Sequence, residues 1–125
     1  MTLNLMTRSQ EFKAGIAVAP VCDLRYYDSK WTEGAMRTPQ GNSEGYASTS
    51  VVPRAKDLHG DLLIVYGTYD DNVHPYNEMA LIDALVAAGK TFDMMAYPMR
   101  KHGITDEAAT LHLYRLMLDF WKRNL

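Results

Sequence analysis

Three short apolar segments, separated by stretches with helical spacing, constrain the fold of this 125-residue chain more than any other feature. Their sequences are GIAVAPV at residues 15–21, DLLIVY at 61–66 and TFDMMAY at 91–97. Continuous apolar runs of this kind are typical of strands that are buried on both faces, as in parallel sheets. Strands that alternate with helices predict an α/β fold in which helices cover both faces of a parallel sheet.

Helical spacing follows each apolar segment. Asp23 is a suitable N-cap for a helix over residues 24–31. A second helix is expected from Pro75 to Gly89 and a third after Thr105, which would cap it. The residues at helical spacing in these three segments are Leu24, Tyr27, Asp28 and Trp31; Met79, Ile82, Leu85 and Val86, which form an apolar stripe; and Leu111, Tyr114, Leu118 and Trp121.

The other segments are shorter or more polar. Residues 1–8 contain good helix formers and no Gly or Pro, so we expect the end of a helix there. Residues 38–50 are rich in Gly, Pro, Asn and Ser and are predicted to be a loop. Residues 54–58 are expected to form a short helical turn. Three strands make only part of such a sheet and leave an edge that needs a partner strand, so we expect an incomplete α/β domain.

Composition excludes several function classes. The net charge is −2, which leaves no electrostatic footprint for nucleic acid. No apolar run approaches the roughly 20 residues that a membrane-spanning helix needs. Cys22 is the only cysteine, so no disulfide forms within the chain, and none of the four histidines has metal-ligand spacing. We therefore predict no metal, no cofactor, no nucleic-acid partner and no membrane segment.

Two predicted loops contain acid and base residues at the ends of neighbouring strands. Asp70 and Asp71 follow the second apolar segment, and His102 follows the third. Ligands of parallel sheets bind at the carboxyl ends of the strands, and a hydrolase triad requires a carboxylate that orients a histidine. Either Asp alone is equally compatible with a turn, and His74 with binding or packing. The order of acid before histidine, which α/β-hydrolases share, favours the triad.

Four segments together resemble the dipeptidyl peptidase IV-like branch of the prolyl oligopeptidase family of serine peptidases. They are FKAGIAVAPV at residues 12–21, YYDSKWTE at 26–33, GTYDDNVH at 67–74 and KHGI at 101–104. The resemblance covers essentially the whole chain. It implies the C-terminal portion of the catalytic α/β-hydrolase domain, over residues 1–125, and release of X-Pro dipeptides from the N-terminus of a peptide substrate.

The resemblance also implies roles for particular residues. Asp70 corresponds to the triad acid and His102 to the triad base. Asn72 corresponds to a residue that contacts the substrate backbone. The pocket for the proline ring corresponds to Val21, Tyr27, Trp31 and Val73. Ordinary core packing is the alternative explanation for the two aromatic residues.

The sequence departs from the family pattern in three places. Leu24 replaces a Trp and Trp31 replaces a Tyr, two changes that keep the pocket apolar. No G-x-S-x-G motif is present, whereas the family's nucleophilic Ser lies in a G-W-S-Y-G-G motif ahead of a segment like residues 1–9. We therefore expect a fragment, a misplaced start or the product of a degraded gene, with the N-terminal part of the same protein as the missing partner.

Two alternatives stay open. Another α/β-hydrolase, such as an esterase or an acylaminoacyl peptidase, would share Asp70 and His102 and differ in the pocket. A non-catalytic fragment that dimerises is the other alternative, because the final helix contributes to a homodimer in the family and residues 111–121 are apolar enough to do so.

Residues 1–125 on their own are expected to have no peptidase activity. They lack the motif that supplies the nucleophile, and loss of a triad member leaves only weak residual catalysis. The measurement is hydrolysis of a Gly-Pro chromogenic amide by the purified chain. Turnover in the usual protease range, about 1–1000 per second, would contradict this expectation.

Overall fold

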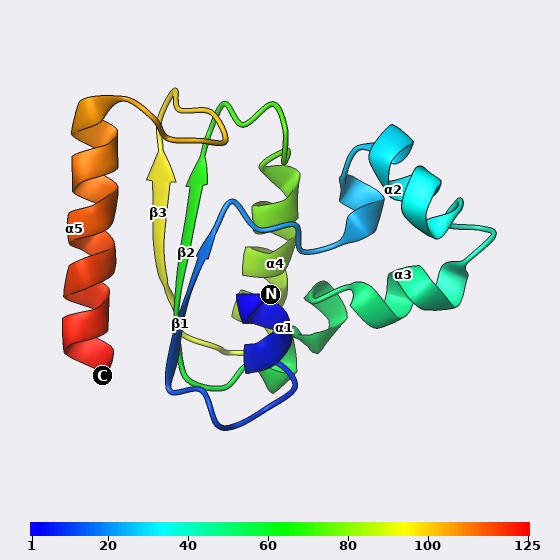
Figure 1. The fold of residues 1–125 in the computed structure, drawn as a ribbon. Coiled ribbons are helices and arrows are strands. Elements are labelled where there is room, and N and C mark those ends of the chain that lie inside the picture. The colour runs from blue at the N-terminus through cyan, green and yellow to red at the C-terminus, as the bar shows by residue number, and fades with distance from the viewer.

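A computed structural model describes all residues from 1 to 125. Its sheet contains three parallel strands in the order β1 (Ala14–Val18), β2 (Asp61–Gly67) and β3 (Asp93–Tyr97). Helices lie on both faces of the sheet (Figure 1). The predicted α/β architecture is therefore confirmed. The first strand ends three residues earlier than expected, because Ala19 has a φ of 44° and turns the chain away from the sheet.

The two faces of the sheet have separate cores. α5 (Glu107–Asn124) covers one face, where Leu63 and Val65 of β2 pack with Phe120 (Figure 1). α1 (Thr2–Met6), α4 (Tyr76–Ala87) and the short helix η2 (Val52–Asp57) pack with the other face. Alternate residues of β2 therefore enter opposite cores, which explains its continuous apolar run.

The expected helix over residues 24–31 is in fact two helices. A single 3-10 turn, η1 (Leu24–Tyr26), precedes α2 (Ser29–Met36). Asp23 caps η1 as predicted, but Asp28 caps α2 by accepting a hydrogen bond from a backbone N–H. Tyr27 has an extended backbone between them. A second N-cap, Asp28, thus interrupts the helix soon after the first, Asp23.

Residues 38–50 are not the predicted loop, because they contain α3 (Ser43–Thr49). The Asn42 side chain caps this helix by accepting a hydrogen bond from Gly45 N–H. The buried Tyr46 hydroxyl donates to the Arg37 carbonyl at 2.8 Å.

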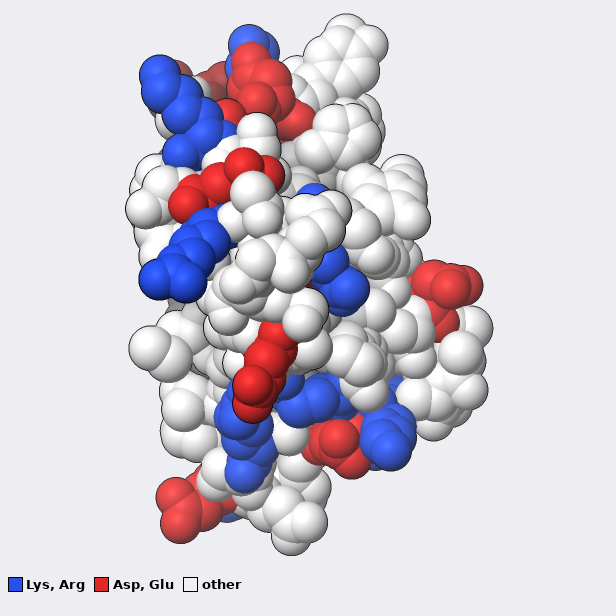
Figure 2. All heavy atoms as spheres, turned by 90° about the vertical axis from the view of Figure 1, so that its right-hand side faces the viewer, with Lys and Arg blue, Asp and Glu red and all other residues white.

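On the face of the molecule that Figure 2 shows, side chains of both charge signs are interspersed.

In both long helices only some of the residues predicted at helical spacing are buried: Leu85 lies in a core, and Ile82 and Trp121 are partly buried against the two cores. α4 begins after Pro75 and stops before Gly89 as expected, yet Met79 and Val86 are exposed and Asn77 is buried. α5 is capped by Asp106 rather than Thr105. Its exposed residues include Leu111, Tyr114 and Leu118, whereas Ala109, Leu113 and Phe120 are buried. No helix is both long enough and apolar enough to cross a membrane.

Candidate active site

The loops after β2 and β3 are held together by their backbones. Tyr69 N–H donates to the Arg100 carbonyl, and Thr68 N–H to the Tyr97 carbonyl, each at 3.0 Å. Gly67, the last residue of β2, makes this close approach possible. A Cβ atom at Gly67 would overlap the carbonyl oxygens of Arg100 and Lys101. The glycine of the GTYDDNVH segment thus brings the acid-containing loop against the histidine-containing one.

Asp70 is buried between these loops, and both of its oxygens are hydrogen-bonded. Oδ1 accepts from the backbone N–H groups of Asn72 and Val73, each at 2.9 Å. Oδ2 lies 2.8 Å from Nδ1 of His102. The backbone donors fix the plane of the carboxylate, so its second oxygen is aimed at the imidazole. The structure therefore brings together the two residues predicted to act as acid and base.

His102 is well placed to move a proton. Its side chain is 42% exposed, whereas that of Asp70 is 1% exposed. A carboxylate at Nδ1 stabilises the tautomer in which Nδ1 is protonated and Nε2 is free to accept a proton. The buried acid and exposed base can therefore act together as a general base at the surface of this chain.

The neighbouring acid, Asp71, makes a different contact. It is exposed and pairs with Lys101 Nζ at 2.5 Å. This hydrogen bond lowers the pKa of Asp71 and raises the pKa of Lys101. Only Asp70 of the two acids contacts the histidine.

The predicted pocket residues form two groups. Tyr27 donates its hydroxyl to Oδ1 of Asn72 at 2.9 Å, and its ring lies 5.6 Å from that of Trp31 in an edge-to-face arrangement. The two rings meet although they do not share a helix. Val73 is buried beside Asp70, whereas Val21 lines a groove next to β1 that residues of α1 also line.

His74 and His112 make contacts of their own away from the acid–base pair. His74 Nδ1 accepts from Tyr76 N–H, which places it in the turn that begins α4. His112 Nδ1 lies 2.7 Å from the Tyr97 hydroxyl, on the α5 side of the sheet. Neither histidine contacts Asp70.

Sequence reasoning missed Glu78, a buried acid in the first turn of α4. Its residue is 0% exposed, and neither carboxylate oxygen has a hydrogen-bond partner. Burial raises the pKa of Glu78 to about 7, and the negative charge of Asp70 adds to the effect. The two apolar residues at positions 81 and 85 are the signal in the sequence, because they share a helix face with position 78.

A buried aspartate that orients an exposed histidine, at the carboxyl ends of adjacent parallel strands, is the arrangement of an α/β-hydrolase. The sequence model of the prolyl oligopeptidase family matches residues 1–125, and the chain belongs to this family of serine peptidases.

Individual relatives agree with this assignment. The chain is 42% identical over 115 residues to dipeptidyl peptidase 4 of Bos taurus, and 43% identical over 115 residues to that of Sus scrofa. Each alignment covers 90% of this chain and 15% of the relative. A crystal structure of Porphyromonas gingivalis dipeptidyl peptidase 4 superposes with a TM-score of 0.96 at 47% identity, over 98% of this chain and 18% of that one. The chain thus spans about a sixth of the length of these relatives.

Gly67→Ala is expected to destabilise residues 1–125 by about 1–3 kcal/mol, because the added methyl forces two backbones apart. Gly34→Ala is the matched control. Gly34 lies within α2 with nothing near its Cβ position, so alanine should be neutral or stabilise by up to about 1 kcal/mol. Urea denaturation followed by tryptophan fluorescence measures both. Equal stability of the two variants would contradict the proposed role of Gly67.

Glu78→Gln is expected to change how stability depends on pH. Folded Glu78 retains its proton up to about pH 7, whereas an unfolded Glu releases it near pH 4.5. The free energy of unfolding therefore falls by on the order of 3 kcal/mol as the pH rises from about 4.5 to about 7. The variant should match the wild type at pH 4 and be more stable at pH 8.

The urea midpoint at each pH is the measurement, and Glu11→Gln, an exposed position outside every helix and strand, is the control. An identical pH dependence in wild type and Glu78→Gln would show that Glu78 ionises normally.

Proposed function

We propose that the complete protein is a serine-type dipeptidyl peptidase that releases N-terminal X-Pro dipeptides, and that residues 1–125 are the C-terminal portion of its catalytic domain. The observation that supports this most directly is the 2.8 Å contact between Asp70 and His102. The dipeptidyl peptidase names of the relatives support the substrate class.

In this proposal, His102 is the general base and Asp70 orients it. Nε2 accepts the hydroxyl proton of a serine from the N-terminal part of the protein as that serine attacks the scissile carbonyl. Asp70 stabilises the imidazolium that forms. The same nitrogen then donates the proton to the departing amine, which leaves an acyl-enzyme that water hydrolyses. Burial of Asp70 favours these steps, because few water molecules compete for its contact with His102.

Tyr27, Trp31, Val73 and Val21 are proposed to line the pocket for proline. The proline ring is flat and apolar, and aromatic rings suit such a surface. Asn72 is proposed to bind the substrate backbone. Its Oδ1 already accepts from Tyr27, so its side-chain N–H groups point away and can donate to a peptide carbonyl.

Two other functions remain as alternatives. An esterase or acylaminoacyl peptidase would use the same acid and base, but the Tyr27–Asn72 contact favours the proline-specific branch. A homodimer through α5 is favoured by the exposure of Leu111, Tyr114 and Leu118, which share one side of the helix. Such a contact is compatible with the peptidase and would also suit a fragment that only dimerises.

In the complete enzyme, Asp70→Asn should reduce turnover of a Gly-Pro chromogenic amide by about 10,000-fold. An amide keeps the shape of the side chain but favours the wrong tautomer of the histidine. Asp71→Asn should cost less than about fivefold, because it removes only an exposed ion pair with Lys101.

Binding of a proline-mimicking competitive inhibitor is the control in this experiment. It should be nearly unchanged in Asp70→Asn, since the pocket residues are untouched. A larger loss of turnover in Asp71→Asn than in Asp70→Asn would show that the roles of the two acids are reversed.

A further inference from the structure

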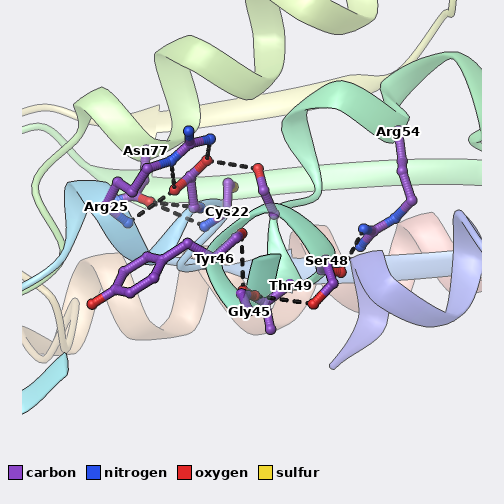
Figure 3. Close-up of polar contacts among 10 residues, drawn as sticks. Cys22, Arg25, Gly45, Tyr46, Ser48, Thr49, Arg54 and Asn77 are labelled. Atoms are coloured by element: carbon purple, nitrogen blue, oxygen red, sulfur yellow. Dashed lines mark hydrogen bonds and ion pairs between the residues drawn. The ribbon is translucent and has the colours of Figure 1, made fainter. Parts of the chain in front are cut away.

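Asn77 is a fully buried amide in the first turn of α4, and all its hydrogen-bonding groups have partners. Its residue is 0% exposed. Oδ1 accepts from the backbone N–H groups of Cys22 at 3.0 Å and Asp23 at 3.3 Å. Nδ2 donates to the Tyr26 carbonyl at 3.2 Å and, more weakly, to the His74 carbonyl at 3.5 Å. Figure 3 shows Asn77 directed at the segment that contains Cys22 and Arg25.

Three partners of Asn77, namely Cys22, Asp23 and Tyr26, lie in a different part of the chain from Asn77 itself. Residues 19–28, which we call the pocket loop, follow β1 and include Val21 and Tyr27. Residues 68–75, which we call the acid loop, follow β2, include Asp70, and lead directly into α4. One side chain therefore joins the loop that would bind proline to the helix that follows the acid loop.

Other contacts of the pocket loop attach it to a third segment. Val51 N–H donates to the Cys22 carbonyl at 2.8 Å, and the Ser50 hydroxyl donates to Asp23 Oδ2 at 2.6 Å. Both donors lie just before η2. These bonds attach the pocket loop to the segment that leads into η2.

The hydroxyl of Tyr27 also reaches the acid loop, at Asn72, but this contact is exposed. Water can replace either partner of an exposed hydrogen bond at small cost. A buried donor or acceptor that loses its partner stays unsatisfied. Asn77 is therefore the stronger of these two hydrogen-bonded links, beside an edge-to-face contact between the rings of Tyr26 and Tyr76 at 4.8 Å.

We propose that Asn77 is a positioning residue that sets the place of the proline pocket relative to the Asp70–His102 pair, and so determines preference for proline. This inference rests on the proposed function. Removal of the amide would leave the N–H groups of Cys22 and Asp23 without partners, and the pocket loop would shift to reach water. The acid loop would keep its geometry, because Asp70 is fixed by its own backbone donors. Substrate binding should therefore suffer more than chemistry.

The test is Asn77→Ala in the complete protein, with kinetics on Gly-Pro and Gly-Ala chromogenic amides. KM for Gly-Pro should rise about tenfold, as expected for unsatisfied buried groups, while kcat changes less than about threefold. The ratio of kcat/KM for proline over alanine should fall by a similar factor. Hydrogen exchange measured by mass spectrometry should be faster in peptides from the pocket loop and unchanged in those from the acid loop.

Asn42→Ala is the matched control, because it removes an amide that joins α2 to α3 and touches neither loop. It should leave KM and the proline preference as in the wild type. Asn77→Asp keeps the side-chain volume and the acceptor but loses the donor to Tyr26. It should change KM in the same direction, which keeps the inference testable if Asn77→Ala does not fold.

Unchanged KM and unchanged exchange in both Asn77 variants would overturn the inference. An equal loss of proline preference in Asn42→Ala would also overturn it, because general destabilisation would then explain the effect. A wild-type enzyme without preference for proline would instead overturn the proposed function. Exchange in the pocket loop would still decide whether Asn77 holds that loop.

Discussion

Parallel pairing of β2 with β3, in a register that sets Gly67 opposite Tyr97, ends both strands at the same level. Every contact between the acid and the histidine depends on this pairing. The two chains leave the sheet side by side, and the absence of a side chain at Gly67 lets their backbones touch. Asp70 and His102 then meet without further support from α2 or α3. The geometry of the sheet thus determines which loop residues lie side by side. The hydrogen bonds of the side chains then set the distance between Asp70 and His102.

Three buried carboxylates around this site differ in their partners. Burial opposes ionisation of Asp23, but hydrogen bonds from Arg25 and Ser50 outweigh it and hold the pKa of Asp23 below its usual value. Asp70 has two backbone donors and a histidine. Glu78 has no partner, and its pKa is raised. Similar burial therefore gives an ion pair, an orienting acid and a proton-retaining acid, according to the donors that the backbone and neighbours supply.

Much of the fold could be predicted from the sequence, because the run in β2 is apolar on both faces and its end is marked by polar residues. Which residues of each helix face the core could not be predicted from the sequence. In α4, apolar residues surround most of the helix, so Met79 and Val86 looked as suitable for the core as Leu81 and Leu85. Strand order predicted that the Asp70–Asp71 loop and the His102 loop would lie side by side, and the family resemblance selected Asp70 of the two acids.

The pocket-loop partners of Asn77 could not be predicted either, because they lie more than 50 residues away in sequence and local pattern does not encode them. The same limit applies to the interruption between η1 and α2. Asp23 and Asp28 both suit a helix start, and only the position of Tyr27 against Asn72 shows why the chain uses both.

The Asp70–His102 contact spans only 32 residues, and both partners belong to the single unit β2–α4–β3. Contacts within one such unit close a short loop, and the entropy lost on closure grows with loop length. The acid–base pair therefore forms over a shorter span of sequence than the pairing of Ala14 in β1 with Asp61 in β2. Both partners, and the backbone donors that fix Asp70, lie within this unit, so the contact involves no residue of the pocket loop or of α5.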